Sequence, residues 1–102
     1  MPHVVFDPAA LADVDDIYDH IGRTLKSPQA ADRTIDRIRE ACEAHANQPR
    51  MGEARSNLGK DLRIFPVGSY VVIYRPLEGG ILVLRVLLGR RNYPSLFRDG
   101  RT

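Results

Sequence analysis

The chain has 102 residues, of which 43% are hydrophobic and 27% charged, as is typical of one globular domain. We place that domain over residues 1–102 and expect 98–102 to fray. No apolar run approaches the roughly 18 residues that a membrane helix needs, and no signal peptide opens the chain. Cys42 is the only cysteine, so an internal disulfide is excluded and a reducing compartment, the cytoplasm, is predicted.

The net charge of +2 conceals a strong asymmetry along the chain. Residues 1–47 carry nine Asp/Glu and five Lys/Arg, a balance of −4, whereas residues 48–102 carry ten Lys/Arg and four Asp/Glu, a balance of +6. Such asymmetry concerns partners rather than fold. The basic half could meet nucleic acid or an acidic segment of another protein. The alternative is a solvated basic surface with no partner.

A short apolar strand at 3–6 and two helices are predicted in the N-terminal half. Asp7-Pro8 and Ser27-Pro28 each supply an N-cap acceptor followed by a proline, which the first helical position tolerates. Apolar residues then recur at spacings of three and four. They are Leu11, Val14, Ile17, Tyr18, Ile21 and Leu25 in the first helix, and Ala31, Ile35, Ile38, Cys42 and His45 in the second. The remaining faces of the first helix are assigned to Asp13, Asp15, Asp16 and Asp19. The short connection makes the pair an antiparallel hairpin.

Three strands joined by hairpins are predicted in the C-terminal half, after a mobile connection over residues 48–60. Turn residues cluster at 66–69 and 77–80. The apolar positions that alternate are Leu62 and Ile64, then Tyr70, Val72 and Tyr74, then Leu82, Leu84, Val86 and Leu88. The element order is therefore β-α-α-β-β-β. It predicts a two-layer α+β domain, with a helical hairpin on one face of a mainly antiparallel sheet and the first strand beside the last.

Arginines interrupt the apolar alternation of these strands at positions 63, 75 and 85, and Arg90 and Arg91 follow at once. Because successive side chains point to opposite faces, one face is expected to pack against the helices and the other to present guanidinium groups. Arg63 and Arg85 share a face if their strands are in phase. The groups either contact a partner or merely solubilise an open face. The histidines show no ligand spacing, so no metal site is expected, and no cofactor is implied.

Four segments in this order resemble the ParE branch of the RelE/ParE toxins. They are DPAALADVDDIYDHI at 7–21, PQAADRTIDRI at 28–38, LRIFPVGSYVVIYR at 62–75 and LRVLLGRR at 84–91. The resemblance runs over residues 3–97. It implies the toxin of a type II toxin–antitoxin module, neutralised by a cognate ParD-like antitoxin. Such antitoxins carry a DNA-binding N-terminal part, so this chain would meet operator DNA only through its partner.

Two killing activities are known among these toxins. ParE-like members trap DNA gyrase on cleaved DNA and stop replication, whereas RelE-like members cut messenger RNA on the ribosome. RNA cleavage needs a general base, a general acid and cations. Arg63 and Arg85 could supply the cations, but all three histidines fall in the N-terminal half, and Tyr93, with an ordinary pKa of about 10, is a poor base.

Gyrase inhibition without catalysis is therefore the prediction. The alternative is a ribosome-dependent nuclease with Arg63, Arg85 and Tyr93 as catalytic candidates. Leu88 stands where ParE-like proteins often have a histidine. That departure keeps open a third reading, in which the chain is non-toxic and serves only as the antitoxin's partner and corepressor.

The residues chosen for target binding and toxicity are Arg85, Arg90, Arg91 and Tyr93, with Arg63 in support. Tyr93 is as readily a packing residue beside Pro94, Leu96 and Phe97. Tyr18 and Arg75 are candidates for antitoxin contact, although Tyr18, Tyr70 and Tyr74 also fit a core or rim role. Cys42 is expected to be inert. We expect the antitoxin's C-terminal segment to be acidic and to cover the basic half of this chain.

Overall fold

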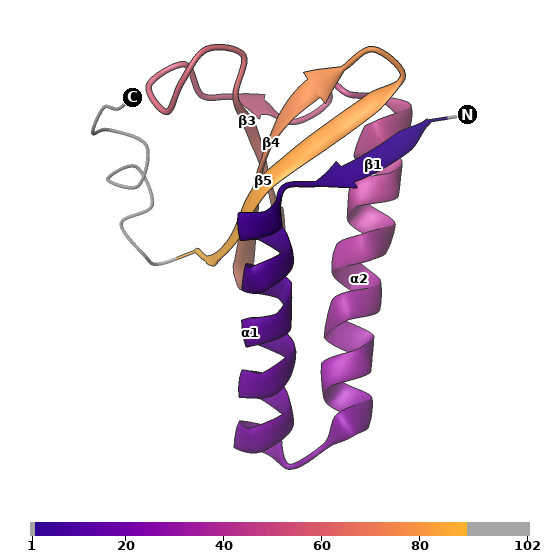
Figure 1. The fold of residues 1–102 in the computed structure, drawn as a ribbon, viewed down its shortest axis with the longest axis vertical. Helices are drawn as coiled ribbons and strands as arrows, with labels where there is room; N and C mark the ends of the chain where they lie inside the picture. The colour runs from indigo at the N-terminus through magenta and orange to yellow at the C-terminus, as the bar shows by residue number, and fades with distance from the viewer. Residues whose placement is uncertain (1, 90–102) are drawn as a thin grey trace.

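Two helices pack on one face of a five-stranded sheet in the computed structural model, which describes residues 2–89 (Figure 1). The elements in chain order are β1 His3–Phe6, α1 Pro8–Leu25, α2 Pro28–Asn47, β2 Glu53–Ala54, β3 Arg63–Val67, β4 Tyr70–Leu77 and β5 Gly80–Leu88. The predicted two-layer α+β class is confirmed. The structure adds the two-residue strand β2, which lies within the predicted connection over 48–60.

The sheet has the strand order β1-β5-β4-β3-β2. β1 runs parallel to β5, with Val4 opposite Ile81, and the remaining pairs are antiparallel. The predicted place of the first strand beside the last is therefore confirmed. Gly80 opens β5 where the backbone of His3 approaches so closely that a Cβ atom at position 80 would collide with the His3 carbonyl.

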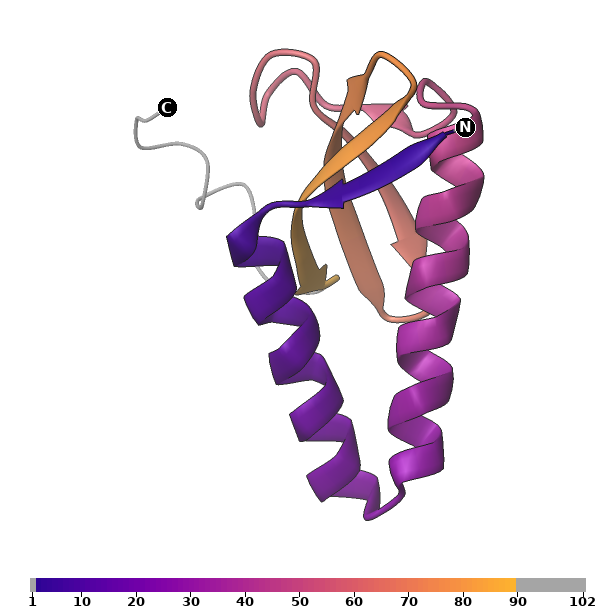
Figure 2. The ribbon, with the colours of Figure 1, turned by 45° about the vertical axis from the view of Figure 1, so that its right-hand side comes forward.

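Both helices begin as the sequence predicts. The Asp7 carboxylate accepts a hydrogen bond from Ala9 N–H at 3.0 Å, and the Ser27 hydroxyl accepts one from Ala30 N–H at 3.2 Å. Lys26, with φ of 52°, ends α1 in a left-handed conformation and starts the turn. The helical hairpin extends well beyond the sheet, so this turn lies far from the strands (Figures 1 and 2).

The buried face of α1 differs from the prediction. Ala10 and Ile17 are buried, and Val14 and Ile21 pack partly against the core. Leu11, Tyr18 and Leu25, which were placed in the same stripe, are instead 52%, 39% and 61% exposed. Residues seven apart lie along one line of a helix. The three therefore form a separate apolar row, which we call the α1 row, beside the buried face.

The larger hydrophobic core lies between the helices and the sheet. It comprises Ala10, Ile17, Ile38, Cys42, Ala46, Phe65, Val72, Tyr74, Ile81, Val83 and Val86. The predicted apolar stripe of α2 is largely buried here, and the His45 ring stacks on Phe65 with 3.7 Å between ring centroids. His45 Nδ1 donates to the Ala41 carbonyl at 2.8 Å, so this histidine serves packing rather than chemistry.

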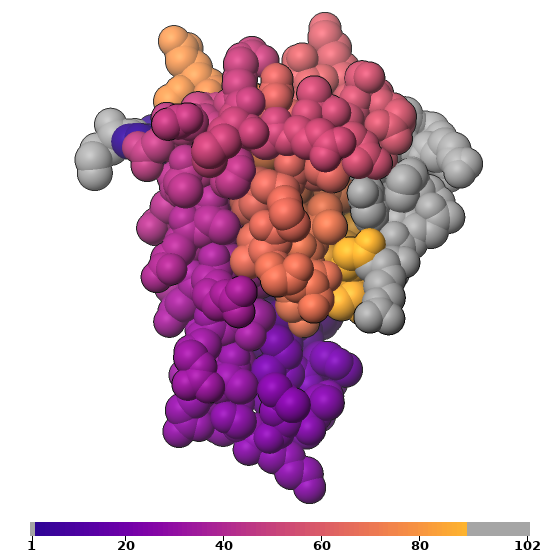
Figure 3. Space-filling view, turned by 180° about the vertical axis from the view of Figure 1, so that it is seen from behind, coloured from indigo at the N-terminus to yellow at the C-terminus, as the bar shows by residue number. Residues whose placement is uncertain are grey.

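A smaller core lies on the opposite face of the sheet. Leu58 and Leu62 pack there against Ile64, Ile73 and Leu87. The connection after α2 therefore contributes a buried side chain, Leu58, in addition to joining the layers. In the space-filling view the same connection covers the top of the molecule above the β3–β4 hairpin (Figure 3).

Candidate functional site

The α1–β5 junction contains an internal ion pair. Arg85 donates from Nε to Asp13 Oδ2 at 2.7 Å and from Nη2 to Asp13 Oδ1 at 2.9 Å, a bidentate contact. The Val86 N–H also donates to Asp13 Oδ2, at 2.9 Å. The Asp13 side chain is only 11% exposed and that of Arg85 27%. Both placements in the sequence analysis were wrong, because Asp13 faces β5 and Arg85 faces the helical layer.

A bulge in β5 explains the position of Arg85. Ile73 of β4 pairs with Arg85, whereas the next residue, Tyr74, pairs with Val83, so Leu84 is an extra residue in β5. Val83 and Val86 consequently both join the core beneath the helices although three positions separate them. Strict alternation, on which the expected phase of Arg63 and Arg85 rested, does not hold across this bulge.

The electrostatics of the pair keep Arg85 charged. The hydrogen bonds that Arg85 donates to the Asp13 carboxylate raise the pKa of the Arg85 guanidinium above its ordinary value, and partial burial opposes that rise. The carboxylate in turn accepts three N–H donors. Such an arrangement fixes the angle between α1 and β5, and it leaves little of either charge for a ligand.

Arg63 is also used inside the fold. Its Nη1 donates to the carbonyl oxygens of Arg50 at 3.0 Å and Gly52 at 2.7 Å, in the loop that follows α2. Tyr74 holds the same loop, because its hydroxyl donates to Pro49 O at 2.7 Å and accepts from Gly52 N–H at 3.0 Å. Arg63 and Arg85 therefore lie on different strands, each with its own internal partners, and the structure does not bring them together.

Tyr74 is fully buried, which confirms its expected core role. Burial raises the pKa of its phenol, while the Gly52 N–H and the charge of Arg63 lower it. A Cβ atom on Gly52 would strike the Tyr74 ring and the Ile64 carbonyl. The sequence therefore needs glycine at position 52 for this buried contact to form.

The two antitoxin candidates are both accessible. Arg75 is exposed and lies two residues after the fully buried Ile73, on the same sheet face as the smaller core. Tyr18 lies in the middle of the α1 row, and a hydrogen bond and the charge of Asp32 raise the pKa of its phenol. Of the three arginines predicted to line the open face, only Arg75 does so.

Arg90, Arg91 and Tyr93 lie outside the described residues and stay predictions.

A hollow of about 310 Å³ opens beside the end of β5. It is lined by Asp13, Asp16, Ile17, His20, Tyr70, Val86, Leu87 and Leu88. His20 of α1 thus lies in the same hollow as Leu88. No Lys or Arg appears among the described residues that line it, so residues 2–89 supply none of the cations that phosphate chemistry needs at this hollow.

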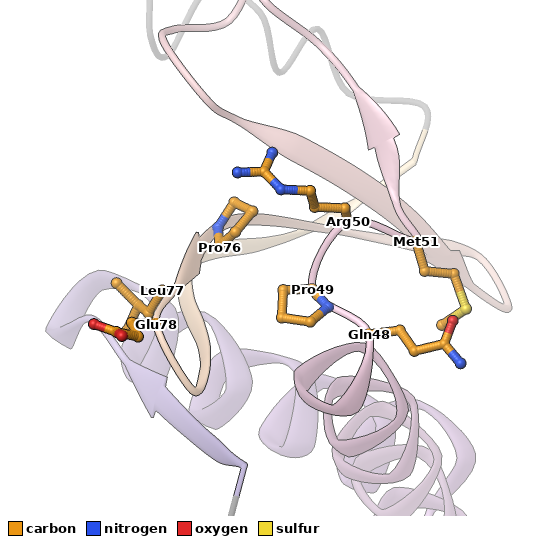
Figure 4. Close-up of a pocket in the computed structure, with 7 residues that line it drawn as sticks. All are labelled: Gln48, Pro49, Arg50, Met51, Pro76, Leu77 and Glu78. Carbon is orange, nitrogen blue, oxygen red and sulfur yellow. The ribbon is translucent and has the colours of Figure 1, made fainter.

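A second, wider hollow of about 680 Å³ separates the loop after α2 from the β4–β5 hairpin. Its lining residues are Gln48, Pro49, Arg50, Met51, Pro76, Leu77 and Glu78. Figure 4 shows that these side chains belong to the loop after α2 and to the β4–β5 hairpin, with Arg50 and Glu78 well apart. Met51 and Leu77 are 51% and 39% exposed. Mixed apolar and charged walls of this kind suit protein contact better than catalysis.

The described residues offer no metal site and no reactive thiol. Within residues 2–89 no group of three or more His, Cys, Asp or Glu side chains could hold a metal ion. No helix in that range is long and apolar enough to cross a membrane. Cys42 is buried, and desolvation raises the pKa of its thiol to about 12, which keeps the sulfur in its unreactive protonated form.

These observations define a small two-layer domain. Its partly buried polar side chains bond one element to another, and its exposed α1 row suits contact with a protein partner. The fold matches a solved structure described as "Chromosomal ParDE TA system from P. aeruginosa", with a TM-score of 0.71 over 86% of this chain and 96% of that chain, at 23% identity. A sequence model described as "ParE toxin of type II toxin-antitoxin system, parDE" matches residues 4–93.

Two curated relatives come from Caulobacter vibrioides. "Toxin RelE2" is 33% identical over 86 residues, which cover 84% of this chain and 93% of the relative. "Toxin ParE3" is 34% identical over 64 residues, which cover 63% of this chain and 64% of the relative. The chain is thus a toxin of the RelE/ParE superfamily, as its sequence predicted. Within that superfamily it belongs to the ParE toxins of type II toxin–antitoxin systems.

Proposed function

We propose that this chain inhibits DNA gyrase, and so blocks replication, by binding its target and not by catalysis of its own. The observation that carries the proposal is the internal use of Arg63 and Arg85. A nuclease would need these cations at a scissile phosphate, yet Arg85 is paired to Asp13 and Arg63 to two backbone carbonyls.

In this proposal Arg85 and Arg63 affect toxicity only indirectly, because they hold elements of the fold in place and do not contact the target. The Asp13–Arg85 pair fixes the end of β5, from which the chain continues to Arg90, Arg91 and Tyr93. We propose that these three contact the target. Reversing the charge of Arg90 and Arg91 together should abolish toxicity while antitoxin binding stays largely intact. A double variant that remains fully toxic would remove these residues from the proposal.

Ribosome-dependent cleavage of messenger RNA is the second candidate, because the relative named Toxin RelE2 matches most of this chain. In that reading Arg63, Arg85 and Tyr93 carry the chemistry. It requires the Asp13–Arg85 pair to open, since a guanidinium held by a carboxylate in two hydrogen bonds stabilises a phosphorane poorly. The third reading, a non-toxic corepressor, rests on Leu88.

The partner that we propose is a cognate ParD-like antitoxin in the cytoplasm, through which the complex reaches operator DNA. The α1 row supports a helical contact, since Leu11, Tyr18 and Leu25 offer three exposed anchors at seven-residue spacing. A groove of about 220 Å³ beside Leu11 is lined by Phe6, Leu11, Val14, Ile35, Ile38 and Arg39. An acidic segment of the antitoxin would cover Arg75 and the rest of the basic half.

A gyrase assay with the purified toxin, with and without its antitoxin, tests the main proposal. Inhibited supercoiling with accumulated linear DNA, reversed by the antitoxin, is the expected result. Unaffected gyrase together with cut messenger RNA on programmed ribosomes would establish the nuclease instead. If the toxin neither inhibits gyrase nor cuts messenger RNA, the corepressor role is the one that stays.

A substitution in the α1 row tests the antitoxin surface. Leu25→Ser should weaken antitoxin binding by about tenfold, because it removes an apolar anchor worth between about 1 and 3 kcal/mol. Leu88→Ser is the matched control, since Leu88 is 43% exposed but lies outside the row. Equal antitoxin affinity for the Leu25 variant and the unmodified chain would place the contact elsewhere.

A further inference from the structure

We propose that the junction between α2 and the β3–β4 turn binds a phosphate group. The junction is a hollow of about 180 Å³, lined by Thr34 and Arg37 of α2 and by Val67, Gly68, Ser69 and Tyr70 of the hairpin. Figures 2 and 3 both show this turn lying against the middle of α2. The site is separate from the Asp13–Arg85 pair and does not depend on the proposed action on gyrase.

Arg37 reaches the backbone of the turn. A Cβ atom built on Gly68 would lie 3.7 Å from Arg37 Nη2, so the guanidinium sits directly beside this residue. Gly68 has φ of +58°, a left-handed conformation that glycine adopts without strain. The absence of a side chain at Gly68 keeps the space in front of the guanidinium open.

The charge of Arg37 is unpaired within residues 2–89. Its acidic neighbour on α2, Asp36, is bonded to Arg39 at 2.8 Å, and Glu40 makes no contact with Arg37 within the ion-pair distance. Arg37 itself is exposed and has no ion pair or hydrogen bond to another described residue. The carboxylates of α2 therefore leave this guanidinium free to meet an anion from outside.

Further donors surround the guanidinium. Ser69 and Tyr70 line the hollow, and their hydroxyls have no hydrogen-bond partner in the described part of the chain. The turn N–H groups of Gly68 and Ser69 donate no backbone hydrogen bond there either. Thr34 is different, because its hydroxyl already donates to Ala30 O at 3.0 Å and so forms only a wall.

This donor set suits a phosphate. Guanidinium, hydroxyl and turn N–H groups are the donors that proteins bring to phosphate oxygens, and no carboxylate lines the hollow to repel the anion. Arg33, one helical turn earlier on α2, is likewise exposed and has no partner among the described residues. Inorganic phosphate and the backbone phosphate of DNA both present the required group.

Titration of the ¹⁵N-labelled full chain with inorganic phosphate, followed by amide NMR, tests the proposal. The amides of Gly68, Ser69 and Tyr70 should shift saturably with phosphate and not with chloride at equal ionic strength. Arg37→Gln should weaken the binding by about tenfold, because it removes a charge-assisted hydrogen bond. Arg33→Gln is the matched control, an arginine on the same helix that does not line the hollow, and should change the affinity by less than about twofold.

A short DNA duplex in place of phosphate distinguishes the two sources. Shifts at the same amides with DNA, lost in Arg37→Gln, would identify a nucleic-acid backbone as the ligand, whereas phosphate binding without DNA binding would identify the free anion. Ser69→Ala, which keeps the turn backbone, should weaken phosphate binding in the folded chain. The proposal is overturned if the three amides do not shift with phosphate, or if Arg37→Gln binds phosphate as tightly as the unmodified chain.

Discussion

Two arginines sit where a helix meets the sheet, and the structure uses them differently. At the α1–β5 junction Arg85 is held by Asp13 through two hydrogen bonds. At the junction of α2 with the β3–β4 turn, Arg37 has no partner among residues 2–89. Of these two arginines, the one with an acid opposite joins the helix to the sheet. The charge of Arg37, which has no acid opposite, remains available to a ligand.

Removing Asp13, the acid that pairs with Arg85 at the α1–β5 junction, should have the largest effect on stability. Asp13→Ala leaves the Arg85 guanidinium and the Val86 N–H without their acceptor, so the free energy of unfolding should fall by about 2 to 4 kcal/mol. Urea denaturation measures the loss. Asp16→Ala removes an exposed carboxylate one helical turn away and should cost less than about 0.5 kcal/mol. Equal losses in the two variants would mean that the pair does not stabilise the fold.

An intermediate loss of stability is expected for the loop after α2, which is held by hydrogen bonds to the Tyr74 phenol and not by an acid. Tyr74→Phe removes the hydrogen bonds to Pro49 and Gly52 and should cost about 1 to 3 kcal/mol. The Tyr74 pKa is raised by burial in the folded chain, so its contribution is complete below the ordinary value of 10.0 and is lost as pH rises above it.

Denaturation at pH 8 and pH 11 measures that pH dependence. The stability gap between the unmodified chain and Tyr74→Phe should narrow at the higher pH. A gap that widens would show that the buried phenol ionises more easily in the folded state than in the unfolded chain.

Substituting the unsatisfied arginine should have the smallest effect on stability. Arg37→Gln breaks no hydrogen bond or ion pair within residues 2–89 and should change the free energy of unfolding by less than about 0.5 kcal/mol. Arg85→Gln leaves Asp13 with fewer donors and should cost about 1 to 2 kcal/mol. Thermal unfolding of both variants compares them under one condition, and a loss for Arg37→Gln as large as that for Arg85→Gln would erase the distinction between the junctions.

The sequence predicts most of this fold because its local signals agree. Asp7-Pro8 and Ser27-Pro28 mark both helix starts, and the turns around Gly68 and Gly79 mark both hairpins. The strand-like run at 3–6 and the order of elements were enough to place the first strand beside the last. Local propensity, apolar spacing and turn chemistry all favour the same two-layer arrangement.

The candidate site was predicted less well, because it depends on contacts between distant segments. The bulge at Leu84 carries no glycine or other local signal, and it turns Arg85 toward the helices. Asp13 gave one usable sign: it falls three residues after Ala10 and four before Ile17, on the buried side of α1. A carboxylate at that spacing predicts a buried partner, and the sequence contains no further sign of which arginine it is.

The hollow at Arg37 was missed for the same reason. Gly68 and Ser69 fall within the turn predicted at 66–69, and no pattern in the sequence singled out Arg37. No spacing in the chain links position 37 to position 68, and only the packing of α2 against the hairpin brings them together. The α1 row is different. Its seven-residue spacing of Leu11, Tyr18 and Leu25 is visible in the sequence, and the structure adds that these side chains are exposed.

A double-mutant cycle on Asp13 and Arg85 tests the central claim, that Arg85 works inside the fold. The free energies of unfolding of Asp13→Ala, Arg85→Ala and the double variant would be measured by urea denaturation at one salt concentration. The structure predicts a favourable coupling energy of about 1 to 3 kcal/mol, so that the double variant loses less than the sum of the two single variants. A coupling energy near zero would contradict the claim and return Arg85 to the surface as a residue free to contact the target.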